Sequence, residues 1–77
     1  VPALDRLEIG KSALILSVGG ENKLRCRLLD MGFVPGTEVS LRRAAPMGDP
    51  LEIALRGYCV ALRRADAANI RIRPREV

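Results

Sequence analysis

The chain has 77 residues, of which 48% are hydrophobic and 3% aromatic, and its 13 Lys and Arg against 9 Asp and Glu give a formal net charge of +4. The length predicts one small domain, and the scarcity of aromatic residues predicts an aliphatic core. No apolar run approaches the roughly 18 residues that a membrane-spanning helix needs. Two cysteines and no histidine argue against a disulfide-rich secreted scaffold and against most kinds of catalytic site.

The first elements are expected to be a strand and a short helix. Residues 13–18 read as an apolar strand, and a Gly-Gly pair ends it. Behind it, Asn22 is expected to be the N-cap of a helix in which Leu24, Leu28 and Met31 recur at helical spacing on one face. The pattern predicts one amphipathic helix.

The end of this helix carries its own signal. Gly32 stands where a left-handed C-terminal cap is needed, and Phe33 is placed to fold back on Leu28. Pro35 and Gly36 then predict a type II turn that leads into the next strand. That strand covers residues 37–43.

The second half of the chain predicts three more strands and one turn of helix. Asp66 is expected to cap that turn, and Pro74 to end the last strand. The predicted segments are a loop at 45–50, a strand at 51–55, a hairpin turn at 56–57, a strand at 58–64, a helical turn at 65–69 and a strand at 70–73.

Together these segments predict a mostly β protein, namely a small SH3-like β-barrel of about five strands. One short α-helix follows the first strand, and a one-turn helix precedes the last. We expect a single domain over residues 1–77, with its core at about 4–73 and a loose tail at 74–77.

Nothing in the sequence predicts catalysis, so we expect neither an enzyme nor a bound cofactor. The carboxylates Glu38, Asp49, Glu52 and Asp66 fall in turns, caps or exposed strand positions, where capping and ion pairing explain them. Glu52 is expected to pair across strands with Arg63. The segment 10–12 ends like a phosphate-binding loop but lacks that motif's first glycine.

Metal binding has two weak candidate ligands. Cys26 and Asp30 are four residues apart, on one face of the predicted helix. No metal site is expected from one chain alone, and a metal-sensing dimer that shares these residues stays open as an alternative. Cys59 is expected to be structural.

The arginines favour acidic partners. Arg42, Arg43, Arg63, Arg64, Arg71, Arg73 and Arg75 fall on or beside strands that could lie together. A small basic nucleic-acid-binding or regulatory module is therefore an alternative function. With one Tyr and one Phe available for base stacking, no stable nucleic-acid complex is expected.

Residues 25–39, which read Arg-Cys-Arg-Leu-Leu-Asp-Met-Gly-Phe-Val-Pro-Gly-Thr-Glu-Val, closely resemble the signature of the FeoA family of ferrous iron transport proteins. Segments 45–53, 56–58, 61–64 and 67–70 match the family's pattern in the same order and at similar spacing. The resemblance covers about residues 4–73, and the ordered combination of short motifs is specific.

The resemblance implies a free-standing cytosolic accessory protein of bacterial ferrous iron uptake. Its implied partner is the cytosolic part of FeoB, a membrane transporter with a G domain. The chain itself is not expected to insert into the membrane, although FeoB would recruit it to the inner face. Homodimer formation stays open. The expected docking residues are those of the helix and the turn after it, namely Arg25, Arg27, Leu29, Phe33 and Val34.

Overall fold

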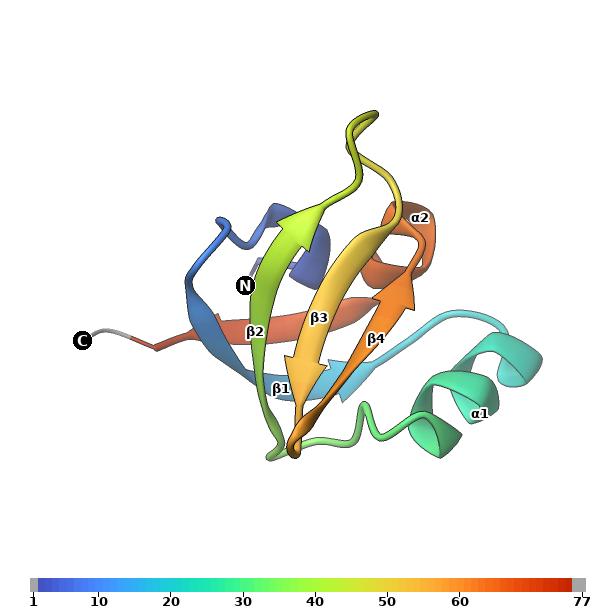
Figure 1. Cartoon of the computed structure of the whole chain (residues 1–77). Coiled ribbons are helices and arrows are strands. Elements are labelled where there is room, and N and C mark those ends of the chain that lie inside the picture. The colour runs from blue at the N-terminus through green and yellow to red at the C-terminus, as the bar shows by residue number, and fades with distance from the viewer. Residues whose placement is uncertain (1, 76–77) are drawn as a thin grey trace.

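The structure is a computed structural model and describes residues 2–75. Within these residues the elements in chain order are η1 (Leu4–Arg6, a 3₁₀ turn), β1 (Ser12–Val18), α1 (Asn22–Asp30), β2 (Glu38–Ala44), β3 (Leu51–Leu55), β4 (Tyr58–Leu62), α2 (Arg64–Ala67) and β5 (Ile70–Pro74) (Figure 1). The predicted mostly β class is confirmed, with a helix after the first strand and a one-turn helix before the last.

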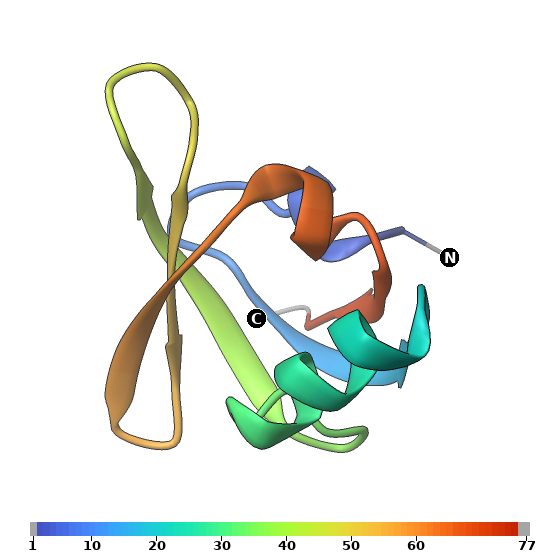
Figure 2. The same cartoon turned by 90° about the vertical axis from the view of Figure 1, so that its right-hand side faces the viewer.

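The described strands form one antiparallel sheet in the order β4-β3-β2-β1-β5. Its register shifts between Ile15 and Ser17 in β1 and between Leu41 and Arg43 in β2, and such bulges increase the local twist of a strand. The sheet curls around the core, but β4 and β5 are its edges and do not pair with each other. The SH3-like barrel is thus open on one side, where Figure 2 shows both helices.

Alternate residues of the strands fill the core, as the sequence pattern predicted. Apolar side chains from η1, α1 and α2 close it, and Phe33 is fully buried among them. Because the strands alternate, one face of each strand supplies these contacts. The buried strand residues are Ala13, Ile15, Val39, Leu41, Leu51, Ile53, Leu55, Leu62, Ile70 and Ile72.

The two predicted turns form as expected. Gly36 has a φ of +90°, and the Thr37 N–H donates to the Val34 carbonyl at 3.1 Å. Arg56 and Gly57 both have positive φ, 48° and 85°, which is the combination of a two-residue type I′ hairpin. The hairpin turn sets the register in which β3 and β4 pair, and the turn at Gly36 leads from α1 into β2.

Both helices start elsewhere than predicted. The N-cap of α1 is Glu21, whose side chain makes no capping hydrogen bond, and Asn22 is already helical. The strand β4 ends at Leu62, and α2 begins at Arg64 with Arg63 as N-cap, so Asp66 lies inside the helix. The cap is the last residue with an extended backbone before the helix, and this residue is Glu21 in α1 and Arg63 in α2.

The last strand continues past its predicted end. Pro74 pairs with Ala13, and the Arg75 N–H donates to the Ser12 carbonyl at 2.9 Å. A proline is tolerated here because β5 is an edge strand. The prediction of a loose tail is therefore wrong for Pro74 and Arg75, and positions 76–77 lie outside the described residues.

Candidate interaction surface

The C-terminus of α1 forms the cap that the sequence predicted. Gly32 has a φ of +106°, its N–H donates to the Leu29 carbonyl at 3.0 Å, and the Phe33 N–H donates to the Leu28 carbonyl at 3.0 Å. This pair of bonds is the Schellman motif. The same motif turns Phe33 into the core, where it is 0% exposed. The prediction that Phe33 contacts a partner is therefore wrong.

Tyr58 ties the same helix end to the sheet. Its hydroxyl donates to the Met31 carbonyl at 2.6 Å. A Cβ on Gly32 would lie 2.5 Å from the Tyr58 Oη, closer than real Cβ contacts come. Gly32 therefore serves two purposes, because it accepts the positive φ and leaves room for the tyrosine. Only the first was visible in the local sequence.

The rest of α1 presents a basic surface with a partly apolar edge. Arg25 and Arg27 are exposed, while Leu29 in the last turn and Val34 beyond it are half-buried. We call Arg25, Arg27, Leu29 and Val34 the helix surface. Four of the five predicted docking residues thus remain accessible, whereas Leu28 is the one fully buried residue of α1.

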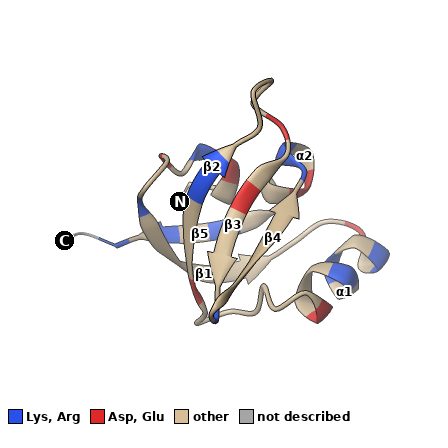
Figure 3. Ribbon diagram, viewed as in Figure 1, with Lys and Arg blue, Asp and Glu red and all other residues tan. Residues whose placement is uncertain are grey.

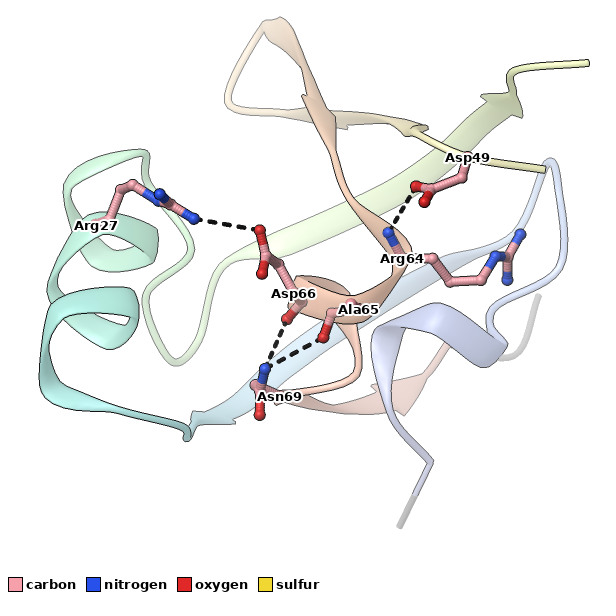
Figure 4. A network of polar contacts seen from close by, with 6 residues as sticks. All are labelled: Arg27, Asp49, Arg64, Ala65, Asp66 and Asn69. Atoms are coloured by element: carbon pink, nitrogen blue, oxygen red, sulfur yellow. Dashed lines mark hydrogen bonds and ion pairs between the residues drawn. The ribbon is translucent and has the colours of Figure 1, made fainter. Parts of the chain in front are cut away.

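An ion pair connects α1 to α2. The Arg27 Nη2 lies 3.2 Å from the Asp66 Oδ2, with the arginine side chain 63% exposed. Asp66 therefore pairs with the other helix and does not cap its own (Figure 4). An exposed pair of this kind adds little stability, so a partner that offers a better carboxylate can recruit Arg27.

A polar network holds α2 to the loop between β2 and β3. The Asp49 Oδ1 accepts from the Arg64 N–H at 2.8 Å, and so supplies the cap that was expected from Asp66 (Figure 4). The Arg64 side chain donates to the carbonyls of Gly48 at 3.1 Å and Asp5 at 2.9 Å. At the C-terminal end of α2, the Asn69 side-chain amide donates to the Ala65 carbonyl at 3.3 Å.

The predicted arginine cluster is divided by the fold. Arg63 follows β4 and Arg71 lies in β5, and these strands are opposite edges of the sheet. Figure 3 shows the basic residues spread over both ends of the sheet and over α1. Arg64 is engaged by α2's network, so the described arginines do not form one continuous track for a phosphate backbone.

Two further carboxylates, Glu52 and Glu38, pair with arginines. Glu52 accepts from Arg43 at 2.8 Å, and not from Arg63 as expected, because Arg63 lies beyond the β3–β4 ladder. This hydrogen bond and the charge of Glu52 raise the pKa of Arg43 above its ordinary value. Glu38 pairs with Arg75 at 3.4 Å. The general expectation of capping and pairing holds for Glu38, Asp49, Glu52 and Asp66.

The two metal-ligand candidates lie on α1. Cys26 and Asp30 are both exposed, as is Cys59 on β4. Among residues 2–75, no three His, Cys, Asp or Glu side chains come close enough to hold a metal ion. A metal site built on Cys26 and Asp30 would need further ligands from another chain.

Comparison with known proteins gives consistent matches along the chain. The protein-family model of the FeoA domain matches residues 3–74. A Porphyromonas gingivalis fusion of Fe(2+) transport protein A with the Fe(2+) transporter FeoB is 41% identical over 69 residues, which are 90% of this chain and 8% of that protein. The chain thus spans a small part of this relative. None of the helices within residues 2–75 has the length and apolarity to cross a bilayer.

Solved structures show the same architecture. The FeoA-like protein of Clostridium acetobutylicum is 36% identical with a TM-score of 0.91, over 99% of this chain and 88% of that one. The FeoA of Stenotrophomonas maltophilia, an SH3 domain protein crystallised in complex with zinc, is 29% identical with a TM-score of 0.81, over 94% of this chain and 89% of that one.

Proposed function

Because the chain belongs to the FeoA family, we propose that it is a cytosolic accessory protein of ferrous iron uptake and acts by docking on the transporter FeoB. One observation carries this proposal: in the Porphyromonas gingivalis relative, a domain 41% identical to this chain is part of the same polypeptide as FeoB. Fusion keeps two domains at high effective concentration, so separate chains need a docking surface to meet.

The helix surface is the best candidate for that contact. It combines two half-buried apolar residues, Leu29 and Val34, with the exposed arginines Arg25 and Arg27, and protein interfaces typically combine apolar contacts with arginine. Leu28 and the Tyr58 hydrogen bond hold the helix in place, so docking needs little additional ordering.

Docking would act on the conformation of the transporter. An accessory protein shifts a conformational equilibrium only if it binds one state more tightly than another. Binding of this chain to FeoB should therefore depend on the nucleotide bound by the transporter's G domain. In this proposal the chain influences iron passage without itself contacting iron.

A retention experiment tests this proposal. The purified chain is applied to immobilised, detergent-solubilised full-length FeoB from the same organism, with and without guanine nucleotide. Specific and nucleotide-dependent retention supports docking. No retention in any nucleotide state contradicts it and favours a basic nucleic-acid-binding module.

Leu29→Glu locates the contact. This change places a charge on the helix surface, so it should abolish retention while the melting temperature changes little. Met47→Glu is the matched control, because Met47 is 92% exposed on the loop between β2 and β3. Retention of Leu29→Glu at the wild-type level would exclude the helix surface, and an unfolded variant would show that Leu29 is structural.

Metal-dependent self-association is a second candidate, favoured by the zinc in the Stenotrophomonas maltophilia structure. Cys26 and Asp30 are exposed on α1 and are free to meet ligands from another copy. Sedimentation with and without Zn²⁺ or Fe²⁺ tests it, because Cys26→Ser should abolish any metal-dependent dimer. An unchanged assembly state in the wild type would dispose of this candidate.

A further inference from the structure

The outer face of β1 carries leucines where a solvated sheet face normally carries polar residues. Ala13 and Ile15 point into the core, and the residues between and after them are Leu14, which is half-buried, and Leu16, which is 44% exposed. An antiparallel sheet with one solvated face is expected to alternate apolar and polar residues. The outer leucines therefore leave apolar area on this face.

Strand alternation places Leu16 on this face, and a β-bulge interrupts the pairing of β1 with β5 at the same residue. The register with β5 pairs Ile15 with Ile72 and Ser17 with Arg71, which leaves Leu16 as the extra residue. Bulges of this kind redirect side chains and are common beside functional sites. The strand thus departs from regular pairing at the position where it exposes a large apolar side chain.

Two arginines of β5 lie beside these leucines. Arg73 is the cross-strand partner of Leu14, and Arg71 pairs with Ser17 next to Leu16. Both arginines are exposed, and among residues 2–75 neither forms an ion pair. Glu38 is the partner of Leu14 on the other side of β1, and it already pairs with Arg75 at 3.4 Å. Figure 3 shows the resulting basic segment on β5.

We propose that Leu14, Leu16, Arg71 and Arg73, the leucine–arginine face, form a second docking surface that binds an apolar segment bearing carboxylates on a partner protein. This proposal rests on the proposed function, since it names the chemistry of a second contact with FeoB. Arginine binds carboxylates through two parallel hydrogen bonds, and the leucines supply apolar area between those anchors.

The charge and composition of the leucine–arginine face favour an acidic protein segment over a second copy of the chain or a nucleic acid. A second copy of the chain would bring the same arginines against each other, and like charges at an interface cost several kcal/mol. Single-stranded nucleic acid needs aromatic side chains for stacking, and this face has none. An acidic segment neutralises Arg71 and Arg73 and covers Leu16 in the same contact.

The face lies on a different part of the molecule from the helix surface. It is formed by β1 and β5 at one edge of the sheet, whereas the helix surface is formed by α1 and the turn after it. Two contacts on one rigid domain strengthen each other through effective concentration. Loss of the leucine–arginine face should therefore weaken binding, whereas loss of the helix surface should abolish it.

Affinity for full-length FeoB in detergent, measured by biolayer interferometry at low and high salt, tests the proposal. Leu16→Ser and the double variant Arg71→Glu/Arg73→Glu should each weaken binding by about tenfold or more, and only the arginine variant should flatten the salt dependence. The matched control Arg42→Glu/Arg63→Glu changes the net charge equally but lies elsewhere, and should bind as the wild type does.

Each other result overturns the proposal. Wild-type binding by both face variants excludes the face and leaves the proposed function intact. If the control variant Arg42→Glu/Arg63→Glu weakens binding equally, the effect comes from net charge and not from the leucine–arginine face. If the wild type does not bind FeoB, the proposed function fails. In that case, binding to phosphatidylserine vesicles is measured. If the wild type binds the vesicles and the arginine variant does not, the leucine–arginine face binds lipid headgroups. If the wild type does not bind the vesicles either, the face binds neither of these acidic ligands and the proposal is overturned.

Discussion

The two helices of this small domain are held to the sheet in different ways. The longer one, α1, has one buried side chain, Leu28, a hydrogen bond at its C-terminus and an exposed ion pair. The shorter one, α2, is anchored at its first residue by Asp49 and through the side chain of Arg64. The length of a helix therefore does not indicate how many contacts hold it to the rest of the domain. The helix that is anchored at its C-terminal end, α1, is the one that offers an accessible surface.

This difference explains why docking is assigned to α1. A helix of nine residues has marginal stability alone, so its tertiary anchors decide whether it stays folded. Its three anchors lie at its C-terminal end, at Arg27, Leu28 and Met31, and leave Arg25 and Leu29 accessible to a partner. In contrast, α2 has four residues and depends on side chains from the loop between β2 and β3 and from its own end.

Of the substitutions that test this difference between the helices, Leu28→Ala should lower the stability of the domain most. It removes the buried anchor of α1 and should cost about 2–5 kcal/mol in the free energy of unfolding, because a cavity remains in the core. Urea denaturation followed by circular dichroism measures this cost. Leu29→Ala, one residue further along, is the control and should cost much less. Equal costs would show that α1 is not anchored through Leu28.

Gly32→Ala should have the next largest effect, about 1–3 kcal/mol, since it places a side chain at positive φ and against the Tyr58 hydroxyl. Thermal denaturation measures it, and amide exchange should speed up in the last turn of α1. In a Tyr58→Phe background the same change should cost less, because the clashing oxygen is absent. An equal cost in both backgrounds would remove Tyr58 from the explanation.

Asp49→Ala should cost about 1 kcal/mol, which is the usual value of a lost N-terminal cap. The affected element should be α2 and not α1, and hydrogen exchange of the amides of residues 64–68 distinguishes them. Asp49→Asn retains an acceptor oxygen and should be close to the wild type. If Asp49→Ala unfolds α1 instead, the two helices are coupled more strongly than their contacts indicate.

Arg27→Ala should have the smallest effect, under about 1 kcal/mol, since the Arg27–Asp66 pair is exposed to solvent. Chemical denaturation at low and high salt measures it, with Arg25→Ala as the unpaired control. A large loss of stability would mean that the ion pair is needed to hold the helices together, and that Arg27 is not available to a partner.

Local sequence determined the parts of this fold that depend on neighbouring residues. Strand alternation, the Gly32 cap, the Pro35–Gly36 turn and the Arg56–Gly57 hairpin are set by side-chain period and by backbone conformational preference, so all of them were predicted. The family resemblance was likewise readable, because its motifs consist largely of these turn and cap residues.

Only the tertiary structure decided the contacts between distant segments. Asp49 caps a helix 15 residues away, Asp66 pairs with Arg27 across 39 residues, and Tyr58 reaches Met31 across 27. Nothing in the local sequence selects such partners, because the curling of the sheet brings them together. For the same reason Phe33 could be recognised as part of a cap but not as core. The bulge that leaves Leu16 unpaired and sets Ser17 opposite Arg71 also arises from strand pairing, which no single segment encodes.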